Sequence, residues 1–151
     1  MPFYSLQQNI FETQAQAIVI PVNCVGVAGA GLALAAKQRF PHWYEDYRQK
    51  CHEMVIDPKK AMTIYKESQP WLINFPTKTH WRKPSSSVLL AYGAEYLYLL
   101  LQQEQIRSVA LPKLGCGLGG QSWYGNNELA SMRSLFVNTL KSLSCDFYLY
   151  E

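Results

Sequence analysis

Short apolar runs rich in β-branched residues alternate along this chain with longer segments whose apolar positions recur every three or four residues. The first pattern is typical of buried strands and the second of helices with one packed face. Strands are predicted at residues 2–6, 17–22, 61–66, 71–75, 108–111 and 146–150. Helices are predicted at residues 31–40, 43–54, 88–103 and 126–143, and the hydroxyls of Ser85, Ser86 and Ser87 can cap the third of them. This order of elements indicates an α/β domain with helices packed on a mixed central sheet.

Glycine-rich stretches follow two of the predicted strands. Asn23 to Gly31 reads Asn-Cys-Val-Gly-Val-Ala-Gly-Ala-Gly, and Gly115 to Gly120 reads Gly-Cys-Gly-Leu-Gly-Gly. Glycine leaves backbone amides open to a close ligand, and amides beside a helix N-terminus bind phosphate well. Because ligands of open α/β sheets bind beyond the carboxyl ends of the strands, the two stretches predict two walls of one phosphate-binding cleft. The first stretch lacks GxGxxG spacing and neither contains GK[ST], which argues against a hydride-transfer enzyme or a P-loop NTPase.

Composition narrows the class of protein further. The 151 residues are 48% hydrophobic and 17% charged, as expected for a single globular domain over residues 1–151. A net charge of +3 is compatible with nucleic-acid contact without requiring it. The N-terminal residues lack the pattern of a signal peptide and no apolar run approaches the ~20 residues of a membrane span, so we expect a cytoplasmic protein without a membrane partner. The four cysteines form no CxxC pair, which predicts reduced thiols and no metal site.

A third segment, Thr77-Lys-Thr-His-Trp-Arg-Lys83, collects basic and titratable side chains after the predicted strand 71–75. A lysine at the end of a buried strand, near other cations, can become a nucleophile toward an aldehyde-like carbon. On residue types alone a solvated basic loop is the favoured interpretation of Lys78, Arg82 and Lys83. The same residues also fit a polynucleotide contact in which Trp81 stacks on a base. His80 taken alone is typical of a surface or hydrogen-bonded histidine.

Polar residues of the glycine-rich stretches also have more than one interpretation. Asn23 can bridge the backbone of its own loop or hydrogen-bond a sugar hydroxyl, and the sequence leaves both open. Cys24 and Cys116 are interpreted as small side chains beside tight backbone rather than as nucleophiles.

Aromatic and apolar residues at helical spacing are predicted to pack in the core. They are Trp43, Tyr44, Tyr47, Tyr92, Tyr96 and Leu99. Trp123 and Tyr124 directly follow the second glycine-rich stretch, so a place in the cleft and a place in the core stay equally open for them.

Three motifs, in this order and spacing, resemble those of the macrodomain family. They are Pro21-Val-Asn-Cys-Val-Gly-Val-Ala-Gly-Ala-Gly-Leu-Ala-Leu34, Asn74-Phe-Pro-Thr-Lys-Thr-His-Trp-Arg82 and Leu111-Pro-Lys-Leu-Gly-Cys-Gly-Leu-Gly-Gly120. The middle motif is similar to that of the branch containing the DNA ADP-ribosyl glycohydrolase antitoxins (DarG) and the terminal ADP-ribose protein glycohydrolase. The resemblance covers nearly the whole chain and implies a three-layer α/β/α macrodomain with a mixed central sheet that binds ADP-ribose.

The resemblance also implies roles for particular residues. Lys78 matches the catalytic lysine of this branch, whose amine acts at the anomeric carbon of the distal ribose through a Schiff-base-type intermediate that water releases. Asn23 is expected near that ribose, the diphosphate between the two glycine-rich stretches, and the adenine near Asn9. The expected substrate contacts are Asn9, Ile10, Asn23, Gly26, Gly29, Gly31, Leu32, Thr77, His80, Trp81, Arg82, Gly115, Cys116, Gly117, Leu118, Gly119 and Gly120. No metal or cofactor is expected.

Two positions depart from the family pattern. Gln8-Asn9 stands where members usually carry Gly-Asp, and an Asn carbonyl can still accept a hydrogen bond from the adenine amino group, without charge assistance. Gly119 stands where the human-type enzyme has an Asp, as in the antitoxin type, which argues against an Asp-assisted reaction on protein esters.

The resemblance therefore implies an ADP-ribosyl glycohydrolase that removes mono-ADP-ribose from DNA, where it is linked to thymine, with Lys78 as the catalytic residue. His80, Trp81 and Arg82 are expected to meet the attached nucleotide strand. The alternatives are an ADP-ribose-binding module without turnover, and a hydrolase of Glu/Asp-linked ADP-ribose on proteins or of ADP-ribose-1″-phosphate. The expected partners are ADP-ribose, ADP-ribosylated DNA and a cognate ADP-ribosyltransferase toxin, and the chain is expected to be a monomer.

Overall fold

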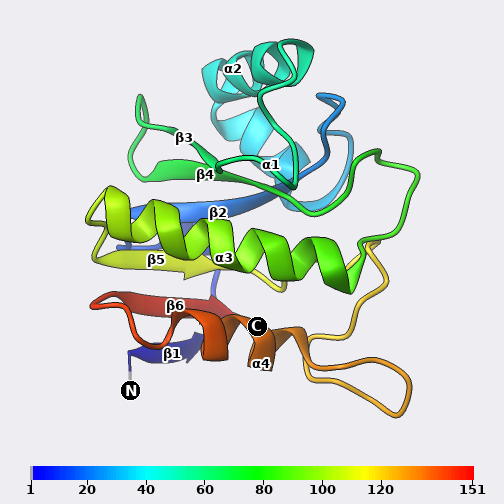
Figure 1. Ribbon diagram of the computed structural model, residues 1–151. Helices are drawn as coiled ribbons and strands as arrows, with labels where there is room; N and C mark the ends of the chain where they lie inside the picture. Colours follow the sequence, from blue (N-terminus) through cyan, green and yellow to red (C-terminus); the bar gives the residue numbers. More distant parts are fainter. Residues whose placement is uncertain (1) are drawn as a thin grey trace.

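A six-stranded mixed sheet forms the centre of the computed structural model, which describes residues 2–151 (Figure 1). The strands are β1 (Phe3–Leu6), β2 (Ala17–Val22), β3 (Thr63–Tyr65), β4 (Trp71–Pro76), β5 (Ser108–Leu111) and β6 (Asp146–Tyr150). They lie in the order β1-β6-β5-β2-β4-β3, and each neighbouring pair is parallel except the antiparallel pair β3 and β4. The predicted mixed sheet is confirmed, with its parallel strands at the centre.

Helices cover both faces of this sheet (Figure 1). The helices are α1 (Gly31–Arg39), α2 (Pro41–His52), α3 (Ser87–Gln103) and α4 (Met132–Leu140), and a 3₁₀ turn, η1, spans Ile10–Glu12. Alternate residues of β2 point to opposite layers, so Ile18 and Ile20 pack with α1 and α2, whereas Val19 packs with α3 and α4. The three-layer α/β/α architecture is thus confirmed. Within residues 2–151, no helix combines the length and apolar character needed to cross a membrane.

The last helix is shorter than the predicted segment 126–143. Asn126 Oδ1 accepts hydrogen bonds from the backbone amides of Glu128 and Leu129, both at 2.8 Å, which holds a turn instead of a helix. Ser131 then caps α4 by accepting from the amide of Ser134 at 3.1 Å. Polar side chains that satisfy local amides therefore delay the helix to Met132.

The side chains predicted to pack in the core are mostly buried on α2 but largely exposed on α3. Trp43 and Tyr47 are fully buried, as predicted, and their rings stack at 5.4 Å. The predicted core stripe on α3 is wrong, because Tyr92 is 43% exposed and Leu99 is 54% exposed. Tyr96 is half-buried, and its hydroxyl donates to the carbonyl of Lys59. The helix is apolar on nearly all sides, so spacing alone did not identify its buried face, which consists of Leu90, Gly93, Ala94, Leu97, Leu100 and Leu101.

Two of the predicted site residues, Asn23 and Lys78, follow the carboxyl ends of β2 and β4. Pairing of the two strands continues past their ends, since the amide of Thr77 donates to Val22 O at 2.9 Å and the amide of Cys24 donates to Thr79 O at 3.2 Å. The residue after each strand is thereby held beside its neighbour. Asn23 and Lys78 consequently lie at the same edge of the sheet.

Candidate functional site

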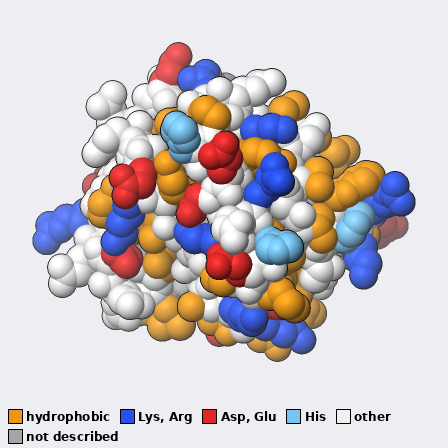
Figure 2. Space-filling view, turned by 90° about the horizontal axis from the view of Figure 1, so that it is seen from above, with side chains coloured by type: hydrophobic (Ala, Val, Ile, Leu, Met, Phe, Trp, Pro, Cys, Tyr) orange, Lys and Arg blue, Asp and Glu red, His pale blue; other side chains and the backbone are white. Residues whose placement is uncertain are grey.

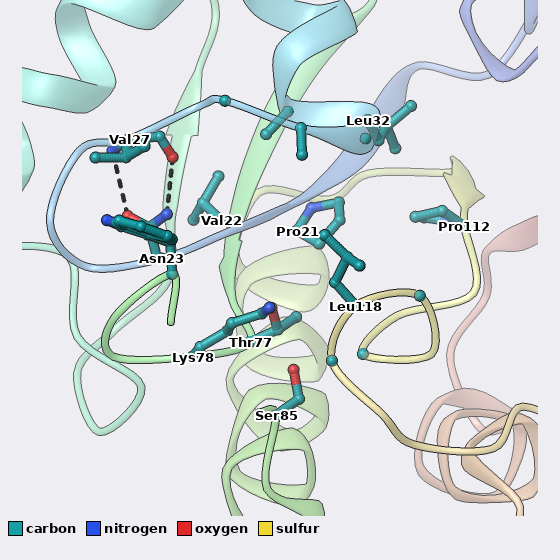
Figure 3. Close-up of a pocket in the computed structure, with 18 of the residues that line it drawn as sticks. Pro21, Val22, Asn23, Val27, Leu32, Thr77, Lys78, Ser85, Pro112 and Leu118 are labelled. Atoms are coloured by element: carbon teal, nitrogen blue, oxygen red, sulfur yellow. Dashed lines mark hydrogen bonds between the residues drawn. The ribbon is translucent and has the colours of Figure 1, made fainter. Parts of the chain in front are cut away.

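A cleft with a volume of about 630 Å³ opens at the carboxyl ends of β2, β4 and β5 (Figure 3). Both glycine-rich stretches and the segment after β4 contribute to its walls. Of the predicted contacts, the cleft brings together Asn23, Gly29, Gly31, Leu32, Thr77, Lys78, Trp81, Gly115, Gly117, Leu118 and Gly119. Segments that are far apart in the sequence thus meet in one site.

Asn23 holds the first wall of the cleft in shape. Its Oδ1 accepts from the amides of Val25 and Val27 and from the hydroxyl of Tyr47, at 3.1, 3.3 and 2.8 Å. Its Nδ2 donates to Val27 O at 2.7 Å, so the side chain closes the loop on itself (Figure 3). The loop-bridging interpretation of Asn23 is therefore confirmed, while its position on the cleft wall keeps the sugar contact as a prediction.

The start of α1 presents unpaired amides to the same wall. Ala30 is the N-cap residue and provides no side-chain hydrogen bond to the first turn. Gly31, the first residue of the helix, has φ +58°, and a Cβ there would meet nothing within 4 Å. An uncapped helix N-terminus combines free N–H groups with the positive end of the helix dipole, which suits a phosphate group.

The loop after β5 forms the opposite wall. Gly115 turns the chain with φ +75°, and Gln121 N donates back to Gly115 O at 3.0 Å to close the turn. Between these residues, the amides of Gly117, Leu118 and Gly119 donate to no acceptor within residues 2–151. Consecutive free amides of this kind form an anion-binding concavity.

Lysine side chains give the cleft its charge. Lys78 and Lys113 line it, and among the described residues no Asp or Glu side chain does. The thiol of Cys24, two residues beyond the end of β2, donates to Lys78 O at 3.6 Å and so holds the backbone of Lys78 in place. The cleft therefore combines positive side chains with two sets of free amides, which favours a ligand carrying phosphate groups.

Both thiols of the glycine-rich stretches are held neutral. Burial raises the pKa of Cys24 to about 12, with the nearby Cys51 and Asp57 adding to the shift. Burial likewise raises the pKa of Cys116 to about 11, although Lys113 opposes the shift, and its thiol donates to Leu114 O at 3.2 Å. A thiol with so high a pKa has very little thiolate near pH 7, so neither cysteine is an activated nucleophile.

Trp81 stands at the rim of the cleft, 46% exposed. The His80 ring lies 5.4 Å from the indole, and the Arg82 guanidinium carbon lies 4.6 Å from the indole ring centre. The amide of Arg82 also donates to His80 Nδ1 at 3.1 Å, which fixes the short segment. The three side chains form a compact aromatic and cationic group, but only Trp81 lines the cleft itself.

Other predicted contacts lie outside the cleft lining in this structure. Asn9 caps η1 by accepting from the amide of Phe11 at 3.0 Å, and Ile10 is 7% exposed in the core beside α1 and α2. Gly26 faces Arg48, and its carbonyl accepts from Tyr44. The full set of predicted contacts outside the lining is Asn9, Ile10, Gly26, His80, Arg82, Cys116 and Gly120.

Some cleft residues were missed by sequence reasoning. They are Pro21, Val22, Val27, Ala30, Ala33, Ser85, Pro112 and Lys113. All except Ser85 lie inside the motifs that carry the family resemblance, at positions that were not counted as contacts. Ser85 was counted among three candidate helix caps, whereas the structure gives that role to Ser86.

Trp123 and Tyr124 do not line the cleft. Trp123 is 4% exposed and packs on Phe136 with ring centres 6.1 Å apart, so its place in the core is settled. Tyr124 is 64% exposed. Elsewhere in residues 2–151, no group of three or more His, Cys, Asp or Glu side chains is arranged to hold a metal ion.

The fold and the cleft define a three-layer α/β/α protein with a cleft at the carboxyl edge of its sheet, lined by lysine side chains and free amides. The sequence matches the Macro domain family over residues 19–130. This chain belongs to the macrodomain family.

Similar proteins define the neighbourhood within that family. A DNA ADP-ribosyl glycohydrolase of Thermus aquaticus is 38% identical over 118 residues, which is 76% of this chain and 33% of that protein. The macrodomain of Thermus aquaticus DarG superposes with a TM-score of 0.88 at 33% identity, over 99% of this chain and 97% of that one. Thermosipho africanus DarTG in complex with ADP-ribose superposes with a TM-score of 0.87 at 30% identity, over 97% of this chain and 40% of that one. The chain spans about a third of the length of the curated relative.

Proposed function

We propose that this chain is an ADP-ribosyl glycohydrolase domain that releases mono-ADP-ribose from DNA in which it is linked to thymine, with Lys78 as the catalytic residue. The observation that carries the proposal is the position of Lys78 in one cleft with both sets of free amides. The likeness to a DNA ADP-ribosyl glycohydrolase supports the same activity. ADP-ribose in the Thermosipho africanus structure supports the same ligand.

The two walls suggest how ADP-ribose would bind. Its diphosphate would lie between the N-terminus of α1 and the amides of Gly117 to Gly119, since both segments line the cleft and carry amides without partners. The distal ribose would then lie near Asn23 and Lys78. Asn23 has one Nδ2 hydrogen beyond the bond to Val27, which is available to a ribose hydroxyl. The adenine would extend toward Asn9, where the amide oxygen stands in for the usual carboxylate.

Lys78 would act as a nucleophile in its neutral form. Its amine would bond to the anomeric carbon of the distal ribose as the bond from that carbon to the thymine nitrogen breaks, and the departing base would take up a proton. Transfer of a proton from the amine to the ring oxygen, as the bond from that oxygen to the anomeric carbon breaks, opens the sugar ring and gives the Schiff-base-type intermediate. Water would then replace the lysine, which releases ADP-ribose and restores the free amine.

Product release from an oligonucleotide carrying ADP-ribose on thymine tests the reaction. Wild type should release free ADP-ribose, and Lys78→Ala should lower the rate by at least a hundredfold, because the nucleophile is lost while the amides that hold the diphosphate remain. Lys113→Ala is a matched control, since it removes the other cleft lysine, and it should weaken binding more than the chemical step. Full activity of Lys78→Ala on this substrate would show that the lysine mechanism is wrong.

Nucleic-acid contact would come from the group formed by His80, Trp81 and Arg82, which adjoins the cleft rim. The face seen from above in Figure 2 intersperses Lys and Arg with Asp and Glu, so it offers no continuous basic patch. The proposal therefore relies on local contact beside the cleft rim. Affinity for ADP-ribosylated DNA should fall more steeply with added salt than affinity for free ADP-ribose, because several phosphates are contacted. Equal salt dependence would favour the alternative of a protein-linked substrate.

The family resemblance further suggests a cognate ADP-ribosyltransferase toxin as a partner. A non-catalytic ADP-ribose-binding module would share the amide contacts but release no product. Micromolar ADP-ribose binding by wild type without release from either DNA or protein substrates would support that alternative.

A further inference from the structure

Ser85 places a buried hydroxyl on the wall of the cleft. The residue is 2% exposed, lies two positions before the first residue of α3, and lines the cavity together with Lys78 and Gly119. Its Oγ has no hydrogen-bond partner anywhere in residues 2–151. Figure 3 shows this hydroxyl pointing into the cavity, toward the side on which Thr77 and Lys78 lie. A buried hydroxyl without a partner is costly, so a group of this kind calls for an explanation.

The backbone of Ser85 is clamped, which fixes where the hydroxyl can go. Its amide donates to Gly119 O at 2.9 Å, and its carbonyl accepts from Gln121 Nε2 at 2.8 Å. The next residue is a direct contrast, because Ser86 Oγ accepts from the amides of Val88 and Leu89 and caps α3. Capping thus accounts for Ser86 and leaves the hydroxyl of Ser85 free for a ligand.

Ser85 Oγ also lies against the loop whose amides are free. A Cβ added at Gly119 would come within 2.5 Å of this oxygen, so the hydroxyl lies directly beside the Gly119 backbone. A Cβ added at Gly115 would lie 3.3 Å from Ser85 Cβ. An oxyanion bound by the amides of residues 117–119 is therefore within the reach of a serine hydroxyl at this position.

We propose that Ser85 is a positioning residue whose hydroxyl donates a hydrogen bond to the distal phosphate of bound ADP-ribose, the one linked to the distal ribose. The inference rests on the proposed function, since it assumes that the cleft takes ADP-ribose. A hydroxyl donating to a phosphate oxygen forms a charge-assisted bond, and the buried Oγ gains the partner that it lacks within the protein. The bond would hold the distal phosphate against the amides of the loop and so fix the ribose in front of Lys78.

Calorimetric titration of Ser85→Ala with ADP-ribose, ADP and AMP tests this role. We expect the Kd for ADP-ribose and for ADP to rise about tenfold, because both carry the distal phosphate. The Kd for AMP, which lacks that phosphate, should stay unchanged. The melting temperature of the free protein should stay the same or rise, because the variant removes a buried polar atom that has no partner.

Ser86→Ala is the matched control, and it should give the opposite result. Loss of the α3 cap should lower the melting temperature and leave the Kd for ADP-ribose unchanged. Unchanged ADP-ribose affinity in Ser85→Ala would overturn the inference, as would a loss confined to ADP-ribose and absent for ADP, which would assign the bond to the ribose. Absence of ADP-ribose binding by wild type would instead overturn the proposed function itself, so the two failures are distinguishable.

Discussion

At the scale of single residues, the second wall of the cleft depends on the missing side chain of Gly119. A Cβ at this position would lie 2.5 Å from both Gly115 O and Ser85 Oγ, closer than such atoms approach in real structures. An acidic residue here, as in the human-type relatives, would require a different course of the loop. The observed conformation of the loop and the buried position of Ser85 therefore require a residue without a Cβ at position 119, which excludes an acidic residue there.

Gly119→Ala should raise the Kd for ADP-ribose by at least tenfold, because the added methyl forces the loop and its free amides to move. The same clash is partly with the Gly115 backbone, which cannot move as freely as a side chain, so the free energy of unfolding should also fall, by about 1–3 kcal/mol. Calorimetric titration beside urea unfolding separates the two effects. An unchanged Kd would mean that the loop relaxes at no cost to the ligand site, and the close contact with Ser85 would then carry no function.

At the scale of elements, α3 approaches the sheet through Gly93. A Cβ at Gly93 would lie 2.3 Å from Phe75 Cζ, so the helix axis is as close to β4 as a glycine allows. Phe75 is fully buried and packs edge-on against Phe136 of α4, with ring centres 5.7 Å apart. One ring thus joins β4, α3 and α4, and β4 carries Lys78 two residues beyond its end.

Gly93→Ala should lower the free energy of unfolding by about 1–3 kcal/mol, because the Phe75 ring must shift inside a packed layer. The direction is informative, since alanine in a helix is favoured over glycine by about 1 kcal/mol when nothing is in the way. Urea unfolding followed by circular dichroism measures the change. Glu95→Ala, at an exposed position of the same helix, is the control and should change stability by less than about 0.5 kcal/mol. Greater stability of Gly93→Ala would contradict the close contact.

Elements with one strong hydrophobic pattern were predictable from sequence. Elements whose bounds or buried face depend on competing hydrogen bonds or on distant residues were not. The continuous apolar run of β2 predicts a strand buried on both faces, and the structure shows one. The start of α4 depends on two polar side chains: Asn126 holds a turn, and Ser131 caps the helix, which therefore begins only at Met132. The buried face of α3 depends on Phe75, which is distant in sequence.

The site divides in the same way. Its glycines were predictable because two glycine-rich stretches directly follow buried strands. Lys78 was singled out by its match to the family motif, since its residue type alone also fits a solvated loop. Ser85 was not predictable, because its burial comes from Gly119 and Gln121, which lie more than thirty residues away in the chain. The loop-bridging bonds of Asn23 to Val25 and Val27 were within reach of sequence reasoning, but the bond from Tyr47 was not, because α2 brings that residue into contact.

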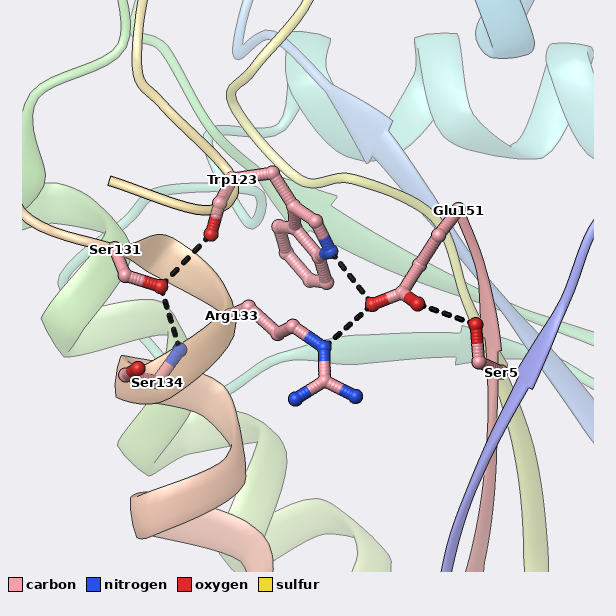
Figure 4. A network of polar contacts seen from close by, with 6 residues as sticks. All are labelled: Ser5, Trp123, Ser131, Arg133, Ser134 and Glu151. Atoms are coloured by element: carbon pink, nitrogen blue, oxygen red, sulfur yellow. Dashed lines mark hydrogen bonds and ion pairs between the residues drawn. The ribbon is translucent and has the colours of Figure 1, made fainter. Parts of the chain in front are cut away.

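At the scale of the whole molecule, a buried carboxylate joins elements from both ends of the sequence (Figure 4). Glu151 follows β6 and accepts from Ser5 of β1, from Trp123 Nε1 at 2.9 Å and from Arg133 Nε of α4 at 2.6 Å. Its side chain is 7% exposed. Since β1 and β6 are neighbours at the edge of the sheet, these bonds tie that edge to the helical layer beneath it.

The same bonds make stability depend on pH. Burial by itself would raise the pKa of Glu151, but the hydrogen bonds from Ser5, Trp123 and Arg133 outweigh it and lower the pKa below its usual 4.5. A carboxyl with a lowered pKa in the folded state stabilises the fold above its unfolded pKa and loses that contribution as the pH falls through the folded pKa. The contribution should therefore be complete at neutral pH and decline below about pH 4.5.

Glu151→Gln should cost about 1–3 kcal/mol of unfolding free energy at pH 7, because it removes the charge and leaves Arg133 and Trp123 with a weaker acceptor. The difference between wild type and variant should shrink as the pH falls from 5 to 3, since wild type then loses its carboxylate as well. Urea unfolding across this range measures both slopes, and Glu128→Gln, at an exposed loop position, controls for removal of a surface charge. A constant difference between wild type and Glu151→Gln at all pH values would show that shape rather than charge makes the contribution. Because neither Glu151 nor Trp123 lines the cleft, ligand affinity at pH 7 should be the same in both proteins.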